Sequence, residues 1–436
     1  MFKKLEQWKE SSKRKPLVLL GARQVGKTFS LKWLGEKHFN NFLYFNFEED
    51  KHLKSLFEDS LAPETITRNL SLYAKQKVED NKTLIIFDEI QGCPRALTAL
   101  KYFCEKRPSL HIAAAGSLLG LKVPKESGFP VGKVDFLRIT PMTFLEFLRA
   151  QNEDELIGLV TSLDIASPIP DAFHLRLNDF LKIYFFVGGM PEAVQEYIKT
   201  KDFESVRKIQ QNILMSYELD ISKHARGQDI QRIFRIWEYL PKQLAKENRR
   251  FIFTALAPSA RAREYESAMQ WLVDAGFVVR VSNISAGRLP LSGYENPNHF
   301  KLYTLDVGLL AALAKLSSQT LVLGEGIFTE FKGAFTENFV AQELIARQVK
   351  PFYWKSEGKA EVDFVIESQG TIFPIEVKSG VNLKAKSLTV FCEQYKSSRG
   401  IRVSLSSYMR GAKVWDVPLY AVSLVARDIK GKETIT

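Results

Sequence analysis

Four short runs of apolar residues stand in the first third of the chain, and polar or amphipathic segments of helix length separate them. The runs are 17–20 (LVLL), 42–47 (FLYFNF), 84–87 (LIIF) and 110–115 (LHIAAA). Short apolar runs that alternate with helices are typical of strands in a parallel sheet buried on both faces. The pattern therefore predicts an α/β domain with a parallel sheet over residues 1–155.

The following part of the chain has a helical pattern. From about residue 140 to 225 it contains FLEFL and the longer segment IYFFVGGMPEAVQEYI, which two glycines and a proline interrupt. Apolar residues at a period near 3.6 are typical of amphipathic helices. We interpret residues 156–225 as a helical lid that follows the sheet.

Residues 226–320 combine helices with alternating segments. Two amphipathic helices are expected around 229–246 and 261–275, and the alternating segments FVVRV and FKLYTL follow them. Helices followed by a β-hairpin favour a winged helix-turn-helix. A helical spacer with a small hairpin would give the same pattern, and this alternative stays open.

The pattern of apolar and polar residues changes again in residues 321–436. A helix is expected at 329–347, followed by strands at 362–366 and 372–377 and by later α/β elements. A separate C-terminal α/β domain is therefore predicted.

The octet GARQVGKT, residues 21–28, has the spacing of a phosphate-binding P-loop and lies between an apolar run and a helix-like segment, as such a loop requires. Gly21 and Gly26 allow backbone N–H groups to wrap around phosphates, and the helix N-terminus favours an anion. Lys27 is expected to reach the β- and γ-phosphates of ATP, and Thr28 is expected to ligate Mg²⁺. The residues predicted to bind the nucleotide here are Gly21, Ala22, Arg23, Gln24, Val25, Gly26, Lys27, Thr28 and Phe29.

A second motif, TLIIFDEIQ, brings Asp88 and Glu89 to the C-terminal end of a predicted strand. Ligands of open α/β sheets bind at that edge. Asp88 can hold Mg²⁺ through water, and Glu89 can orient and polarise the attacking water. Together with Lys27, these residues predict catalysis of ATP hydrolysis.

The strand HIAAA ends in Gly116 and Ser117, which places a small polar side chain near the γ-phosphate if the strands have their usual order. An ordinary strand-ending turn is the alternative. Because a cation stabilises a transferring phosphoryl group, an arginine from a second molecule could complete the site. The sequence does not choose among the candidates Arg138, Arg226, Arg232 and Arg235.

The segment AEVDFVIESQGTIFPIEVKSG carries a second candidate site. Positions two apart on a strand face the same side, so Glu376 and Lys378 are expected to point towards Asp363 across a hairpin. Two carboxylates would hold Mg²⁺ or Mn²⁺ and an ammonium would position water, an arrangement suited to phosphodiester hydrolysis, with Glu337 as a third carboxylate ligand. A half-exposed strand with a surface Lys-Glu pair has the same alternation, so the metal site competes with that simpler interpretation.

The overall charge favours a polyanionic partner. The 436 residues carry a formal net charge of +11, spread along the whole sequence. Nucleic acid, and DNA in particular, is the predicted partner, while a protein partner and an oligomer stay open. The basic residues that flank the predicted recognition helices are Lys242, Lys246, Arg249, Arg250, Arg261 and Arg263.

Cysteine usage and hydropathy indicate the cellular compartment of the protein. The three cysteines form no CxxC pair, which argues against disulfides and structural zinc. The N-terminus lacks an apolar signal core, and no uncharged apolar stretch reaches the roughly 18 residues of a membrane span. A cytoplasmic location without membrane contact is expected.

Several motifs in order give the chain a family resemblance. GARQVGKT, FDEIQ, AAGSLLG, FPVGKVDFLRITPMTFLEFL, VGGMPEAV, FKLYTLDVGLL, GAFTENFVAQEL, VDFVIE and IEVKSG occur along it. With these motifs the sequence resembles prokaryotic AAA-type ATPases that carry a C-terminal domain of unknown function, relatives of archaeal P-loop ATPases fused to a winged helix. AAGSLLG departs from the serine-rich run of that family.

The resemblance implies a fold for the last domain. In that family it looks like the PD-(D/E)XK nuclease fold, whose active-site positions match Glu337, Asp363, Glu376 and Lys378 in this sequence. The expected fold class is α/β multidomain: a P-loop NTPase parallel sheet with a helical lid, a winged-helix middle domain and a C-terminal restriction-endonuclease-like α/β domain. The same fold also serves as a binding platform.

Three functional hypotheses remain. The first is an ATP-hydrolysing AAA-type protein that acts on nucleic acid through a metal-dependent nuclease-like domain. The second is a nucleotide-switched protein that binds nucleic acid or another protein, or that acts in signalling. In this hypothesis the nuclease-like domain is inactive. The third, an ATP-dependent remodeller of proteins, needs neither a basic surface nor a nuclease-like metal site.

Overall fold

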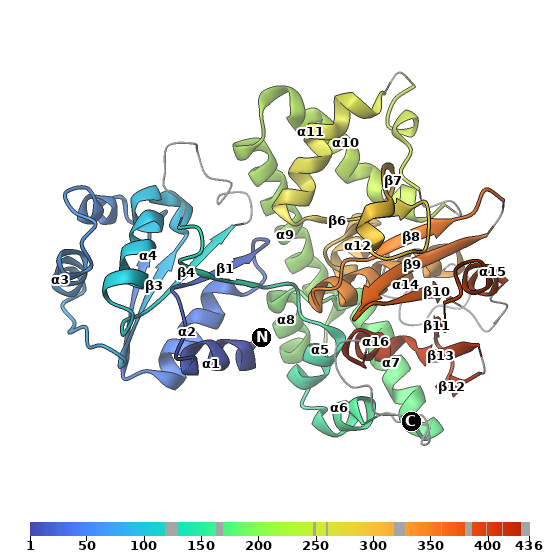
Figure 1. Ribbon diagram of the computed structural model, residues 1–436, viewed down its shortest axis with the longest axis horizontal. Coiled ribbons are helices and arrows are strands. Elements are labelled where there is room, and N and C mark those ends of the chain that lie inside the picture. The colour runs from blue at the N-terminus through green and yellow to red at the C-terminus, as the bar shows by residue number, and fades with distance from the viewer. Residues whose placement is uncertain are drawn as a thin grey trace. The chain divides into compact units, whose positions relative to one another are not determined.

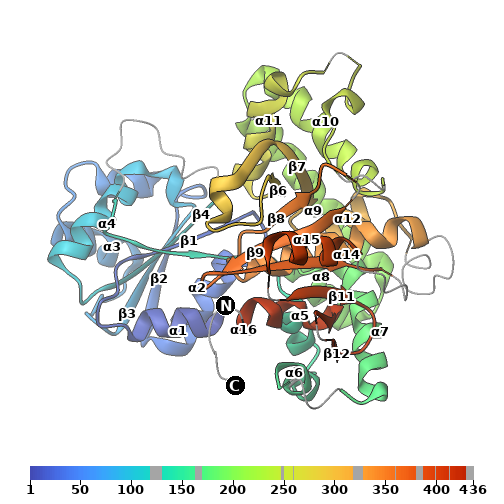
Figure 2. The same ribbon diagram turned by 45° about the vertical axis from the view of Figure 1, so that its right-hand side comes forward.

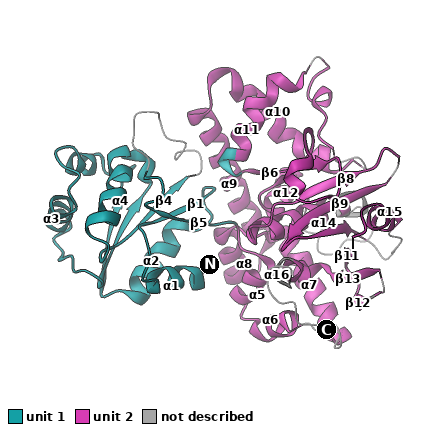
Figure 3. Ribbon diagram, in the orientation of Figure 1, with its two compact units in different colours: residues 1–140, 274–276 teal, residues 141–273, 277–436 magenta. Residues whose placement is uncertain are grey.

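The computed structural model describes ten stretches of the chain (Figure 1). They are residues 1–117, 130–162, 169–246, 250–258, 260–317, 328–358, 360–379, 386–397, 399–411 and 413–428. The chain divides into two compact units, residues 1–140 with 274–276 and residues 141–273 with 277–436 (Figure 3). The four domain ranges predicted from the sequence stay predictions.

The first unit contains a parallel sheet of five strands. Its elements are α1 (Phe2–Glu10), β1 (Leu17–Gly21), α2 (Lys27–His38), β2 (Asn41–Asn46), α3 (Pro63–Ala74), β3 (Thr83–Asp88), α4 (Pro94–Lys106), β4 (His111–Ser117) and β5 (Asp135–Arg138). The strand order is β2-β3-β4-β1-β5, and every pairing is parallel. The parallel sheet expected from the four apolar runs is confirmed.

The strand β5 was not predicted, because it lacks an apolar run. Its four residues alternate between half-buried and exposed, as on an edge strand that pairs on one side only. By contrast, all six residues of β3 are buried. Burial of β3 extends to its last residue, Asp88, so this carboxylate must find polar partners within the protein.

The helices predicted between residues 140 and 225 are present in the second unit. Its helices are α5 (Phe144–Ala150), α6 (Asp154–Thr161), α7 (Asp171–Val187), α8 (Pro191–Thr200), α9 (Phe203–His224), α10 (Gly227–Leu244), α11 (Ala262–Ala275), α12 (Val307–Leu313), α14 (Phe328–Ala346), α15 (Lys386–Tyr395) and α16 (Val422–Asp428). None of the helices in the described stretches is both long enough and apolar enough to cross a membrane.

The second unit also contains a mixed sheet of eight strands. They are β6 (Val278–Ile284), β7 (Glu295–Thr304), β8 (Phe352–Lys355), β9 (Glu361–Ser368), β10 (Thr371–Val377), β11 (Gly400–Ser404), β12 (Met409–Arg410) and β13 (Val414–Pro418), in the order β12-β13-β11-β10-β9-β8-β6-β7. The β6–β7 hairpin, which the sequence assigned to a winged helix, joins this sheet because β6 pairs in parallel with β8. One sheet therefore spans the predicted boundary between residues 320 and 321. Alternation of apolar and polar residues identifies a hairpin but does not determine which other strand the hairpin pairs with.

Helices of the second unit, among them α14 and α15, pack on this sheet. α14 contacts β7 and β10, and α15 contacts β9, β10 and β11 (Figure 2). Under α15, Phe391 joins a buried cluster with Trp354 and Val362. α14 brings polar side chains to the sheet, among them the buried Glu337.

Two sequence motifs, VGGMP and LDVG, contact each other inside the second unit. The backbone N–H of Gly189 donates to the carboxylate of Asp306 (2.6 Å), which also caps α12 by accepting from the N–H of Leu309 (3.0 Å). A Cβ on Gly188, whose φ is +72°, would lie 2.1 Å from Asp306. The segments VGGMP and LDVG therefore fit together only because the first lacks side chains at this contact.

The candidate nucleotide site and the C-terminal carboxylate cluster

The P-loop lies between β1 and α2, in the order that the sequence predicts. Gly26 precedes α2 with a φ of 91°, a conformation that favours glycine. A Cβ on Gly21 would lie 2.5 Å from the carbonyl oxygen of Ile139 on the neighbouring chain segment. α2 begins without a side-chain cap, so its N-terminus has the backbone N–H groups and the dipole field that bind phosphate.

The side chain of Lys27 lies inside the loop. It is 7% exposed, and its Nζ donates to the carbonyl oxygens of Ala22 (2.7 Å) and Gly21 (3.2 Å). Val25 is buried beneath the loop, whereas Phe29 is 66% exposed. The remaining predicted contacts, Arg23 and Gln24, are half-buried and exposed respectively.

Asp88 joins the loop to the neighbouring strands. Its Oδ2 accepts from the hydroxyl of Thr28 (2.7 Å) and from the hydroxyl of Tyr44 in β2 (2.8 Å). Burial raises the pKa of Tyr44, and the hydrogen bond to Asp88 raises it further. Three elements that are distant in sequence therefore meet on one carboxylate oxygen.

Glu89 follows Asp88 with a left-handed backbone, at a φ of 48°. Its N–H donates to Asp88 Oδ1 (3.0 Å), and its carboxylate accepts from the side-chain amide of Gln91. Ser117, at the end of β4, is the register partner of Gly21 in the β1–β4 ladder. β4 lies between β1 and β3, so Ser117 stands beside the start of the P-loop. Its place near the γ-phosphate stays a prediction.

Tyr44 and Gln91 were not predicted as site residues. Tyr44 lies in an apolar run, where an aromatic residue is expected to be part of the core. Only the parallel pairing of Tyr44 with Ile86 places it beside Asp88. The signal for Gln91 was its place in FDEIQ, two residues after Glu89.

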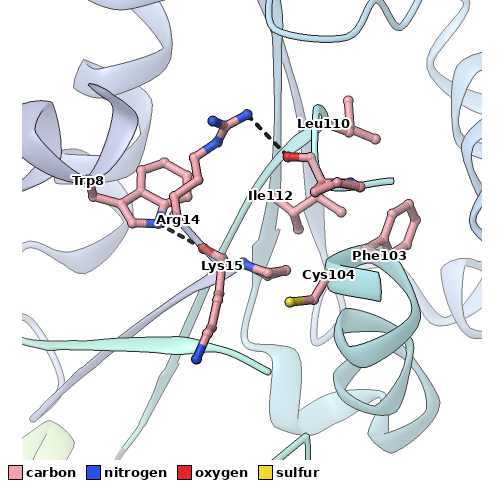
Figure 4. A pocket seen from close by; sticks show the side chains of 9 residues that line it. Trp8, Arg14, Lys15, Phe103, Cys104, Leu110 and Ile112 are labelled. Atoms are coloured by element: carbon pink, nitrogen blue, oxygen red, sulfur yellow. Dashed lines mark hydrogen bonds between the residues drawn. The ribbon is translucent and has the colours of Figure 1, made fainter. Parts of the chain in front are cut away.

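A small pocket lies near the opposite edge of this sheet, where β1 and β4 begin (Figure 4). Trp8, Arg14, Phe103 and Leu110 help to line it, and the indole N–H of Trp8 donates to the carbonyl oxygen of Lys15 (2.8 Å). Its volume of about 10 Å³ matches one water molecule. This pocket is too small for a nucleotide.

In the second unit, the structure brings together the C-terminal residues that the spacing predicted. Lys378 Nζ lies 2.5 Å from Glu376 Oε1, and Asp363 Oδ2 accepts from the backbone N–H of Val377 (2.9 Å). Burial raises the pKa of Glu376, which is 5% exposed, while Lys378 opposes that shift. Glu376 Oε2 is buried with no hydrogen-bond partner.

Glu337 reaches the same region from α14, but another residue stands beside it. Lys301 of β7 is 1% exposed, and its Nζ lies 2.8 Å from Glu361, 3.6 Å from Asp363 and 3.7 Å from Glu337. We call these four residues the Lys301 cluster. Neither Lys301 nor Glu361 was predicted as a site residue.

The Lys301 cluster does not fit the divalent metal ion that the sequence predicted. An ammonium already lies within ion-pair distance of two of the three proposed ligands, Glu337 and Asp363. Within the described stretches, no three His, Cys, Asp or Glu side chains are grouped so that they could hold a metal ion. The predicted ligand set Glu337, Asp363 and Glu376 stays a prediction that this geometry disfavours.

The basic residues of the middle region have mixed environments. Lys242, Arg261 and Arg263 are exposed, and Lys246 is exposed with its Nζ donating to Tyr239 (2.7 Å). Arg250 is half-buried, and Arg249 lies outside the described residues.

Family models match three parts of the chain. Residues 13–148 match an AAA domain, and residues 178–320 and 332–420 match two domains of unknown function, DUF8612 and DUF4143. The first unit is accordingly a P-loop domain of AAA type. The match over 178–320 crosses the predicted boundary at residue 225, and the nuclease-like fold of the last domain stays a prediction.

Curated proteins give no match to this sequence. Among solved structures, a Walker-type ATPase of Pyrococcus abyssi is similar with 16% identity, a TM-score of 0.44 and coverage of 72% of this chain and 95% of that one. The ORC1 protein of Aeropyrum pernix in complex with DNA has 12% identity, a TM-score of 0.28 and coverage of 72% and 90%. The RuvB Holliday junction branch migration motor of Thermotoga maritima has 14% identity, a TM-score of 0.26 and coverage of 69% and 90%.

Proposed function

We propose that this protein binds ATP with Mg²⁺ at the P-loop of the first unit and hydrolyses it. The contact between Thr28 and Asp88, 2.7 Å between Oγ1 and Oδ2, is the observation that supports this most strongly. It joins the two residues that P-loop chemistry needs around one cation, although they are 60 positions apart in sequence.

Each residue of this site has a distinct role in the proposal. Lys27 and the N–H groups at the start of α2 bind the phosphates. Thr28 and Asp88 would hold Mg²⁺, which when bound draws negative charge from the phosphoryl oxygens. Glu89, held through its contact with Gln91, orients the attacking water.

The test compares two substitutions. We expect Lys27→Ala to abolish binding of labelled ATP, because the ammonium stabilises the phosphates already in the bound ground state. Glu89→Gln should bind ATP as the unsubstituted protein does but hydrolyse it about a hundredfold more slowly, because the amide cannot accept the proton of water. Equal loss of binding in both variants would contradict these roles.

For the second unit, we propose binding of nucleic acid rather than cleavage. The net charge of +11 supports a polyanionic partner, and the exposed Lys242, Arg261 and Arg263 are available to phosphates. Cleavage through Asp363, Glu376 and Lys378 would need the metal ion that the Lys301 cluster disfavours. The contacts of Lys301 therefore favour the account in which the nuclease-like domain is a binding module.

The two accounts of the second unit differ in one measurement. Plasmid, linear, branched and single-stranded DNA and RNA are incubated with ATP and either Mg²⁺ or Mn²⁺, and both binding and strand scission are followed. We expect binding without scission. Scission by the unsubstituted protein that is lost in Asp363→Asn and in Lys378→Ala would support the nuclease account. If the protein neither binds nor cuts any of these nucleic acids, the partner of the second unit would be a protein.

A further inference from the structure

Lys301 reaches its cluster from an outer strand of the sheet. β7 lies at the edge, and Lys301 pairs in register with Val281 of β6. Its ammonium lies 5.2 Å from the centre of the Tyr353 ring on β8. The ammonium also meets Glu361 and Asp363 of β9, although β6 and β8 stand between β7 and β9 in the sheet order.

The carboxylates around Lys301 are held by further contacts. Glu337 Oε2, which lies 3.7 Å from the ammonium, also accepts from the hydroxyl of Tyr303 (2.8 Å). Asp363 directs Oδ1 to Lys301 and Oδ2 to the backbone N–H of Val377. The acidic groups on α14 and β9 are thus oriented around one ammonium.

The ammonium of Lys301 is buried and lies within ion-pair distance of three carboxylates, those of Glu337, Glu361 and Asp363. A buried ammonium is tolerated only when opposite charges compensate it, and the converse holds for buried carboxylates. Lys301 and its cluster therefore depend on each other for charge balance.

We propose that Lys301 is the resident cation of this carboxylate cluster, and that it excludes a divalent metal ion from the place where the nuclease-like fold would hold one. A second cation at this place would meet the ammonium at close range. Glu337, Glu361 and Asp363 are not grouped as metal ligands while Lys301 lies among them. Without the ammonium, their oxygen atoms, of the kind that Mg²⁺ and Mn²⁺ prefer, would be able to close around one divalent ion. This inference concerns the second unit alone and does not depend on ATP hydrolysis.

The test measures Mn²⁺ binding to the full-length chain without nucleotide, by electron paramagnetic resonance of free Mn²⁺. We compare the unsubstituted protein with Lys301→Met, which keeps the length of the side chain but not its charge, and with Lys301→Arg, which keeps the charge. Lys301→Met is expected to bind one additional Mn²⁺ about a hundredfold or more tightly than either charged form, because a unit charge within 4 Å is removed. Mn²⁺ at the P-loop is common to all forms and cancels in the comparison.

A second readout is thermal unfolding. Mn²⁺ should raise the melting temperature of Lys301→Met, where it replaces the missing charge, and not that of the Lys301→Arg variant. Adding Asp363→Asn to Lys301→Met should abolish the additional Mn²⁺ site. A folded Lys301→Met variant that gains no Mn²⁺ would overturn the proposal.

The unsubstituted protein provides a test that does not require Lys301→Met to fold. Asp363→Asn and Glu376→Gln should leave its Mn²⁺ binding unchanged, because no metal ion binds at these residues while Lys301 is present. Loss of a bound Mn²⁺ in either variant would show that metal and lysine occupy the site together, and would refute the exclusion. ATP hydrolysis, followed in parallel, reports separately on the first unit.

Discussion

At the residue scale, Tyr44 is the residue of the candidate nucleotide site whose role can be tested most directly. Its hydroxyl and that of Thr28 donate to the same oxygen of Asp88, so Tyr44 helps to orient the carboxylate that Thr28 contacts. The Lys32 ammonium lies 4.0 Å from the Tyr44 ring centre and restricts the ring. Under the proposed function, Tyr44 is therefore a positioning residue for Mg²⁺ rather than a catalytic one.

Tyr44→Phe removes this hydroxyl and keeps the ring. A hydrogen bond to a charged group contributes about 1.5–3 kcal/mol, so we expect the Mg²⁺ concentration for half-maximal ATP turnover to rise about tenfold. Turnover at saturating Mg²⁺ should change little, because the lost contact orients Asp88 and does not touch the phosphates. Steady-state ATPase rates over a Mg²⁺ series provide the measurement.

Tyr73→Phe is the matched control for Tyr44→Phe. Tyr73 also donates its hydroxyl to a carboxylate, that of Asp50, but on an exposed surface of the same unit. Its substitution should leave the Mg²⁺ dependence unchanged. The same Mg²⁺ dependence in Tyr44→Phe and in the unsubstituted protein would exclude the positioning role.

At the element scale, α14 stabilises the second unit through a buried acid. Glu343 Oε1 accepts from the backbone N–H of Phe144 (2.7 Å), the first residue of α5, while its Oε2 is buried without a hydrogen-bond partner. Burial raises the pKa of Glu343 to about 7, with Arg347 opposing the shift and Glu146 adding to it. The helix thus carries an acid that is easier to protonate in the folded state.

This raised pKa predicts how stability depends on pH. The contribution of Glu343 is fully present below the unfolded pKa of 4.5 and is lost as pH rises through about 7. The loss is on the order of 3 kcal/mol, since one pKa unit corresponds to about 1.4 kcal/mol. Asp306, whose pKa burial raises to about 6, acts in the same direction. Glu343→Gln should therefore flatten the fall in unfolding free energy between about pH 5 and pH 8.

Urea unfolding at several pH values measures this effect. Glu238→Gln on α10 is the control, because Glu238 is exposed and its charge is solvated in both states. That control should keep the pH profile of the unsubstituted protein. An unchanged profile in Glu343→Gln would mean that Glu343 does not hold its proton in the folded state.

At the scale of the whole molecule, the positive charge makes a prediction about salt. A protein that displaces counterions from several phosphates binds more weakly as salt rises, and each phosphate contact adds about one to the slope of log affinity against log salt. We expect affinity for duplex DNA to fall steeply between about 50 and 200 mM salt. The double substitution Lys242→Ala and Lys246→Ala should reduce the slope by about two.

The control is a pair of exposed lysines elsewhere in the second unit. Lys199→Ala with Lys208→Ala removes the same charge from α8 and α9. If both pairs change the slope equally, binding depends on net charge alone and the middle region has no special role. Absence of DNA affinity at low salt, with and without ATP, would remove the nucleic-acid proposal.

Features that depend on neighbouring residues could be predicted from the sequence. The four apolar runs predicted β1 to β4 because strands buried on both faces need consecutive apolar residues. The P-loop was predictable because its glycines, Lys27 and Thr28 stand within eight consecutive residues. The contact of Glu376 with Lys378 followed from the period of a strand.

Which distant residues share these sites depends on the pairing of strands in the fold. Tyr44 reaches Asp88 because β2 pairs with β3, and Lys301 reaches Glu361 because β6 joins its hairpin to β8. Strand pairing is set by packing across the whole sheet, so no local pattern shows that a lysine of one hairpin lies among the carboxylates of another. The sequence alone therefore predicts a metal site from the carboxylates, and the fold adds the ammonium that competes with the metal.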